Sequence, residues 1–256
     1  MPIEGLSMDM VVYLLGAGFL SAFIDAAVGG GGLISTPALM MTGLPMSTVL
    51  GTNKLASMMG SLTSTLSFLH SGKIDKRLTG RLFPLAVGGA VAGAFTVRFI
   101  SPDFMRQLVI VMLLLVTVYT LFKKDWGAVS TYAGLKGQAV WLCPVAAVVL
   151  GYYDGFFGPG TGSFLIFTFL MFGFDFVVAA GNAKVLNFGS NIGALLTFIS
   201  TGSVYYSYGL VMGAAMVVGA YAGSRVAITQ GVRYVKPLFL AVSITLVGKQ
   251  VWQLFH

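Results

Sequence analysis

The sequence predicts an all-α integral membrane protein made of two repeats of about five helical segments each, with eight to ten membrane spans. Hydrophobic residues make up 57% of the chain and charged residues 9%, whereas soluble domains usually carry about 25% charged residues. So few charges cannot give 256 residues a water-facing shell, and lipid is therefore the expected solvent. We treat residues 1–256 as a single membrane domain.

A repeated order of residues divides this domain into two copies, at residues 10–123 and 138–255. The offset between the copies is 129 residues up to Gly31 and 130 from Gly32, which one inserted residue near Thr161 explains. The first copy holds Asp25, Gly29, Gly31, Gly32, Gly43, Gly51 and Lys54, and the second repeats this order as Asp154, Gly158, Gly160, Gly162, Gly173, Gly181 and Lys184.

Ten apolar runs supply the segments, and eight of them are long enough to cross the membrane as helices, since a layer of ~30 Å needs about 20 residues. The other two runs, 33–43 and 163–174, are short and follow a glycine-rich break in each repeat. Paired short segments of this kind usually mark a transporter site. The eight long runs fall at 10–28, 47–70, 79–100, 105–122, 138–157, 177–200, 206–228 and 236–255.

The short segments either cross the membrane or enter and return on the same side. If they cross, ten basic residues of the connections lie on one side and two on the other; if they return, the count is seven against five. The positive-inside rule favours crossing. Crossing also makes the second repeat inverted relative to the first, although an arrangement of eight spans stays open.

Two lysines, Lys54 and Lys184, lie inside apolar segments at matching positions of the repeats. A charge at the bilayer centre costs ~3 kcal/mol on insertion scales, so each needs compensation. In one interpretation the two ammonium groups line a cavity for a small anion; in the other, each lysine pairs with Asp25 or Asp154 and holds helices together. Polar neighbours at helical spacing complete the candidate binding site: Asn53, Ser57, Ser61, Asn182, Asn187 and Asn191.

The glycine breaks, 29–32 and 158–163, each lead into the start of a short helix. Unpaired backbone N–H groups and the positive dipole end at such a start bind anions. We therefore include in the candidate site Gly31, Gly32, Gly160, Thr161, Gly162 and Ser163. The alternative is that these glycines only allow helices to approach closely, which is the better interpretation for Gly89, Gly93, Gly219 and Gly223 inside long helices.

Asp25 and Asp154 end the segments just before the breaks. A carboxylate at that depth is either protonated or paired with a lysine, so both are candidates for proton coupling, with a purely structural pair as the alternative.

The single cysteine and two histidines form no metal-ligand spacing, and we expect no metal and no cofactor. The net charge of +7 is spread between apolar runs, which indicates topology signals and excludes nucleic acid as a partner.

The two breaks with their following lysines resemble the sulfite exporter TauE/SafE family. The resemblance rests on Asp25 to Pro37 with Gly51-Thr52-Asn53-Lys54, and on 155–163 with Asn182-Ala183-Lys184. It implies a multi-pass transporter of the bacterial inner membrane that moves small sulfur-containing or organic anions, such as sulfite, sulfoacetate or another organosulfonate. We expect a secondary transporter, most simply an exporter, that works by alternating access with possible proton coupling. The alternatives are a passive anion channel and a membrane-embedded enzyme; the oligomeric state is not predicted.

Overall fold

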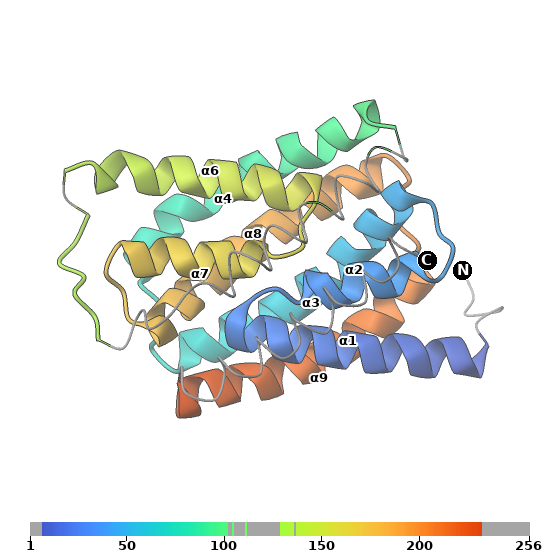
Figure 1. Cartoon of the computed structure of the whole chain (residues 1–256), viewed down its shortest axis with the longest axis horizontal. Coiled ribbons are helices and arrows are strands. Elements are labelled where there is room, and N and C mark those ends of the chain that lie inside the picture. The colour runs from blue at the N-terminus through green and yellow to red at the C-terminus, as the bar shows by residue number, and fades with distance from the viewer. Residues whose placement is uncertain (1–6, 102–103, 105–110, 112–128, 136, 232–256) are drawn as a thin grey trace.

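The computed structural model describes residues 7–101, 104, 111, 129–135 and 137–231, and within them it contains eight α-helices and no strand, as predicted (Figure 1). The predicted runs 105–122 and 236–255 lie outside this part. In the first repeat the helices are α1 (Met8–Val28), α2 (Gly32–Met40), α3 (Met46–His70) and α4 (Lys76–Thr96), which ends in a 3-10 turn (Val97–Phe99). In the second they are α6 (Ala139–Phe156), α7 (Thr161–Met171), α8 (Phe176–Ser200) and α9 (Tyr206–Gln230).

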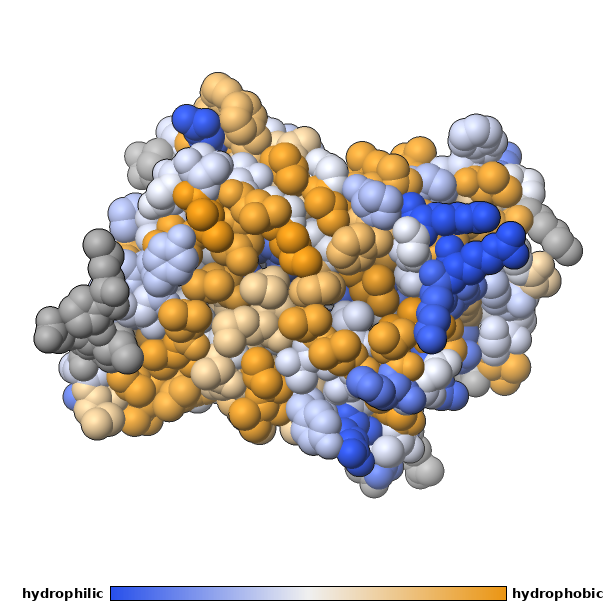
Figure 2. Space-filling model, turned by 180° about the vertical axis from the view of Figure 1, so that it is seen from behind, coloured by the Kyte–Doolittle hydropathy of each residue, from blue (hydrophilic) through white to orange (hydrophobic). Residues whose placement is uncertain are grey.

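Four of these helices are long and apolar enough to cross a membrane: α1, α4 with its 3-10 turn, α6 and α9. Helices α3 and α8 have 25 residues each, but they carry the polar stripes with the two lysines and are largely buried between the others. Figure 2 shows hydrophobic side chains covering most of one face, with hydrophilic ones gathered at one end. The arrangement is that of a multi-pass membrane protein, in which polar helices are shielded from lipid by apolar ones.

The repeats interlock, because the first helix of each packs on the fourth helix of the other, α4 on α6 and α9 on α1. Glycines bring these backbones together. A side chain at Gly93 would overlap the carbonyl oxygen of Tyr152, and one at Gly223 would overlap that of Phe23. These two contacts are equivalent under the repeat offset. The same holds for Gly89 and Gly219, so the packing interpretation of these four glycines is confirmed.

The packing separates the helices into two halves, each built from both repeats (Figure 1). One half contains α1, α3 and α9 and the other α4, α6 and α8. They meet mainly where α3 packs against α8. Each half therefore combines the central helix of one repeat with the first helix of the same repeat and the fourth helix of the other.

Helices α3 and α8 run antiparallel at the centre. Lys54, near the start of α3, reaches Asn191 in the second half of α8, while Thr65 donates a hydrogen bond to the carbonyl of Lys184 near the start of α8. Between these contacts, Asn191 Nδ2 donates to Ser61 Oγ at 3.4 Å. Ser61 and Asn191 are equivalent in the two repeats, so their contact lies on a pseudo-twofold axis. This geometry is consistent with inverted repeats.

The short helices α2 and α7 have 9 and 11 residues, which at 1.5 Å per residue covers about half of a ~30 Å layer. Helix α2 runs back along α1, so that Tyr13 Oη donates to the carbonyl of Ala38. Helix α3 then begins at that same end, where Val49 and Leu14 share one apolar cluster. The chain direction thus agrees with the crossing arrangement, in which α1 and α3 are parallel.

The charged ends of the helices agree with this direction. Arg98 follows α4 at the end where α1 begins. The positive-inside rule assigns the opposite end to the cytoplasm, because the basic residues gathered there are Lys73, Lys76, Arg77, Arg81 and Arg225. The remaining basic residues of the connections lie outside the described part of the chain.

Candidate functional site

Each buried lysine forms an ion pair with a carboxylate of the other repeat. Lys54 Nζ lies 2.9 Å from Asp154 Oδ1, and Lys184 Nζ lies 2.7 Å from Asp25 Oδ2. Lys54 comes from α3 and Asp154 from α6, whereas Lys184 comes from α8 and Asp25 from α1. Both pairs therefore bridge the two halves of the molecule, and each offsets the cost of placing a charge inside the membrane.

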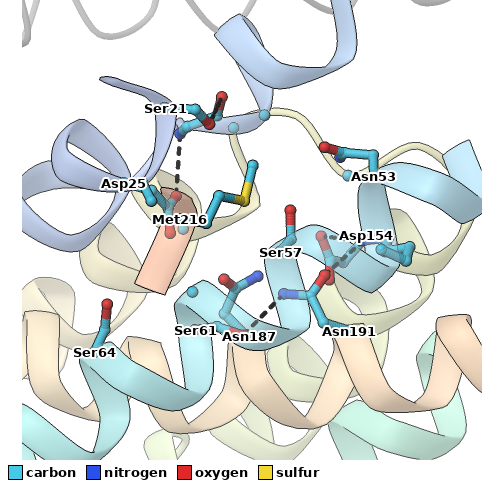
Figure 3. Close-up of a pocket in the computed structure, with 18 residues that line it drawn as sticks. Ser21, Asp25, Asn53, Ser57, Ser61, Ser64, Asp154, Asn187, Asn191 and Met216 are labelled. Carbon is cyan, nitrogen blue, oxygen red and sulfur yellow. Dashed lines mark hydrogen bonds and ion pairs between the residues drawn. The ribbon is translucent and has the colours of Figure 1, made fainter. Parts of the chain in front are cut away.

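A small polar cavity, partly open at the molecular surface, lies between these pairs. Figure 3 shows its side chains converging from α1, α3 and α8. Among the lining side chains of the described residues, only Ala22 and Met216 are apolar, apart from glycines. The polar and charged lining residues are Ser21, Asp25, Asn53, Lys54, Ser57, Ser61, Ser64, Asp154, Asn187 and Asn191.

The two ion pairs face this cavity differently. Lys54 lines the cavity and also donates to Asn191 Oδ1 at 3.2 Å, whereas Lys184 is fully buried and lies outside the lining. The carboxylates differ in the opposite sense: the side chain of Asp154 is 2% exposed and that of Asp25 is 23% exposed. The two half-sites, although equivalent in sequence position, are therefore chemically unequal.

The free oxygens of both carboxylates also have partners. Asp154 Oδ2 accepts a hydrogen bond from the hydroxyl of Ser190. Asp25 Oδ1 accepts one from the backbone N–H of Gly31, at 3.0 Å. The N–H at the start of α2, which the sequence suggests as an anion site, thus already binds an anionic group of the protein.

The two glycine breaks contact each other at the centre of the molecule. A side chain at Gly29 would overlap the backbone of Ser163, and a Cβ at Gly32 would lie 2.8 Å from Pro159 Cα. At Gly158, which has a φ of +97°, a Cβ would lie 3.0 Å from Lys54 Nζ. Glycine is needed here both for close backbone contact and for room beside the ammonium group.

Comparison with known proteins agrees with this geometry. Residues 14–249 match the sequence model of a family described as "Sulfite exporter TauE/SafE". The chain belongs to the sulfite exporter TauE/SafE family. As a chain of this family it is a membrane transporter protein, and the resemblance noted in the sequence is confirmed.

Curated relatives of this TauE/SafE chain are each named as a probable membrane transporter protein, which points to transport rather than catalysis. ORF9 of Sinorhizobium sp is 36% identical over 244 residues, covering 95% of this chain and 93% of the relative. A protein of Haemophilus influenzae is 34% identical over 248 residues, covering 96% of both chains. YfcA of Escherichia coli K12 is 34% identical over 237 residues, covering 91% of this chain and 86% of the relative. No solved structure matches the chain.

The structure of this TauE/SafE chain brings most of the candidate site residues to the cavity. Those that line it are Gly31, Gly32, Asn53, Lys54, Ser57, Ser61, Gly160, Gly162, Asn187 and Asn191, together with the coupling candidates Asp25 and Asp154. Within the part of the chain described here, the buried Oδ1 of Asn53 has no hydrogen-bond partner.

Four candidate residues do not line the cavity: Lys184, Asn182, Thr161 and Ser163. Asn182 Oδ1 accepts the backbone N–H of Asp75 just before α4, at 2.8 Å. The side chains of Thr161 and Ser163 donate to backbone carbonyls at the two breaks. Each of these three polar groups holds a loop in place.

The role of Asn182 also follows from the repeat. Its equivalent is Thr52, whose hydroxyl accepts the backbone N–H of Tyr205 just before α9. Each side chain therefore fixes the start of the fourth helix of the other repeat. The sequence alone did not distinguish the role of Asn182 from that of Asn53, because both lie just before a buried lysine.

Several lining residues were missed in the sequence: Ser21, Ala22, Gly60, Ser64 and Met216. Gly158 also lines the cavity and belongs to the glycine break 158–163 that the sequence analysis singled out. Two of the missed residues carried a signal. Ser64 extends the stripe of Ser57 and Ser61 by one more helical turn, and Ser21 lies one turn before Asp25 on the same face of α1. Met216 comes from α9, and nothing in its neighbourhood in the sequence indicates a cavity.

Proposed function

We propose that this protein is a secondary transporter that carries a small anion, such as sulfite, sulfoacetate or another small organosulfonate, and binds it beside Lys54. The observation that carries the proposal is the polar cavity between the repeats, in which Lys54 is the only lysine among the described lining residues. We propose export as the direction because the matched family is described as a sulfite exporter.

The chemistry of the lining favours a small oxyanion over a bulky organic one. Lys54 supplies an ammonium group, Ser57 and Ser61 supply hydroxyls, and Asn187 and Asn191 supply amide N–H donors. Such donors satisfy several oxygen atoms at once. The described lining contains no aromatic side chain, so it offers no stacking surface for an aryl group.

Alternating access follows from the two halves of the fold. Each half is held by glycine-mediated backbone contacts, while the halves meet mainly along α3 and α8, next to the cavity. Rocking one half against the other about this contact would open the cavity to either side in turn. The buried ion pairs bridge the halves, so they must change during this motion or act as its pivot.

The test is exchange of labelled sulfite across proteoliposomes, with sulfoacetate, taurine, sulfate and chloride as competitors. We expect saturable counterflow that a sulfur oxyanion or sulfonate competes, and a loss of at least about tenfold in Lys54→Gln, since one charge-assisted hydrogen bond contributes about 1.5–3 kcal/mol. Lys73→Gln, at an exposed lysine outside the cavity, is the matched control and should retain its flux.

Other outcomes assign other functions. Flux without saturation or counterflow would indicate a passive anion channel. Saturable flux that survives Lys54→Gln would mean that the lysine is only a structural partner of Asp154. Chemical conversion of sulfite in the vesicles would indicate a membrane enzyme.

A further inference from the structure

We propose that the Lys54–Asp154 pair opens in every transport cycle, with the anion taking over Lys54 and one proton neutralising Asp154, while the Lys184–Asp25 pair stays closed. This inference rests on the proposed anion transport and assigns its coupling. It makes the two half-sites, which are equivalent in the sequence, different in function.

The charges around the cavity require a compensating cation. Lys54 and Asp154 cancel one another, as do Lys184 and Asp25. No other charged side chain belongs to the described lining of the cavity. An anion that enters this neutral site alone would leave an uncompensated charge in a medium of low dielectric constant, which is strongly unfavourable. A proton on one of the two carboxylates restores the balance.

The ammonium group beside the cavity is that of Lys54, whose side chain is 3% exposed. It lines the cavity and has two acceptors, Asp154 Oδ1 and Asn191 Oδ1. An anion in the cavity can replace the first acceptor while the second is kept. The ammonium group of Lys184 is fully buried and paired with Asp25, which itself lines the cavity. The anion would have to displace Asp25 to reach Lys184.

The proton is then expected on Asp154. This side chain is 2% exposed, and after losing Lys54 its remaining hydrogen-bond donor within the described residues is the hydroxyl of Ser190. A buried carboxylate without a counter-ion takes up a proton instead of remaining charged. Asp25, in contrast, keeps both Lys184 and the N–H of Gly31.

Among residues 7–101, 129–135 and 137–231, the surroundings of Asp154 supply no other positive charge to replace Lys54. Helix α8 presents Ser190, and helix α4 packs closely against Gly155 through the backbone of Ala90. The neighbouring Tyr153 donates its hydroxyl hydrogen to the carbonyl of Pro159. The remaining charged groups near the cavity are Asp25 of α1 and Lys184 of α8, which form the other pair.

The proton and the anion would together release one contact between the halves. Lys54 belongs to the half with α1 and α9, and Asp154 to the half with α4 and α8. When this pair opens, the Lys184–Asp25 pair still joins the halves and serves as a pivot. Binding of the anion and of the proton is thereby linked to the motion that exposes the cavity to the other side of the membrane.

The test uses the full chain in proteoliposomes with the membrane potential held at zero. With the wild type, an inward proton gradient should accumulate labelled sulfite about tenfold per pH unit, as one proton per anion requires. Asp154→Asn mimics the protonated state, so it should retain exchange of sulfite at equal concentrations but lose this accumulation. Lys73→Gln, at an exposed lysine outside the cavity, is the control and should keep the accumulation.

Accumulation that persists in Asp154→Asn would overturn the inference, because the proton would then travel on sulfite or on another group. Accumulation driven by a sodium gradient in place of a proton gradient would also overturn it. If Asp154→Asn fails to fold, the wild type is tested for proton uptake on binding sulfate or methanesulfonate, whose charge is constant near neutral pH. One proton per anion supports the inference, and none refutes it. Absence of any saturable sulfite exchange in the wild type would instead refute the proposed function.

Discussion

Removal of the Lys54 ammonium group should destabilise the protein more than removal of the Lys184 ammonium group. Lys54→Gln leaves the carboxylate of Asp154, 2% exposed, without its counter-ion, and breaking a buried pair in this way costs about 3–5 kcal/mol. Lys184→Gln leaves Asp25, which is 23% exposed and keeps the N–H of Gly31, so we expect a smaller cost of about 1–2 kcal/mol. The difference follows from which carboxylate can reach water in the cavity.

The measurement is unfolding of the purified protein in mixed micelles with increasing sodium dodecyl sulfate, with Lys73→Gln as a control that should match the wild type. The double variant Lys54→Gln with Asp154→Asn should recover most of the loss, because no unpaired buried charge remains. Equal losses in Lys54→Gln and Lys184→Gln would refute the assigned asymmetry. A double variant as unstable as Lys54→Gln would show that the loss does not come from the stranded carboxylate.

Two further predictions test the packing and the topology. Gly93→Leu should destabilise the protein by more than about 1–3 kcal/mol, because its side chain would overlap the backbone of α6. Gly88→Ala lies on the same helix with open space around it. This control should be neutral or stabilise the protein by up to about 1 kcal/mol. Unfolding of both variants in mixed micelles decides this, and equal stability would contradict the close contact of α4 with α6. In a Cys143→Ala background, cysteines at the equivalent positions Lys73 and Ser203 should react with an impermeant thiol reagent from opposite sides of the membrane, Lys73→Cys from the cytoplasm. Labelling of both from one side would contradict the inverted arrangement.

The lysines show how far the sequence alone determined the site. Their depth in apolar segments and their repetition identified Lys54 and Lys184 as residues that require compensation, since composition and spacing are properties of the chain itself. The stripe of Ser57 and Ser61 was also evident from helical spacing. The class of fold, the two repeats and the family resemblance followed from the same one-dimensional patterns.

Only the tertiary structure decided which carboxylate pairs with which lysine. The sequence offered Asp25 and Asp154 to both lysines, and the pairs form between repeats because α3 packs against α8 where the two halves of the molecule meet. Such contacts join residues distant in the chain, and no local pattern encodes them. The assignment of Asn182 to a loop contact has the same origin.

Which of the two lysines lines the cavity was likewise outside the reach of the sequence. Duplication placed Lys54 and Lys184 at equivalent positions, yet only Lys54 lines the cavity. The sequence determined that two charged groups must be compensated inside the membrane, because that requirement depends on residue type and depth. The structure decided which of them meets the cavity, because exposure depends on how neighbouring helices fill the space around each group.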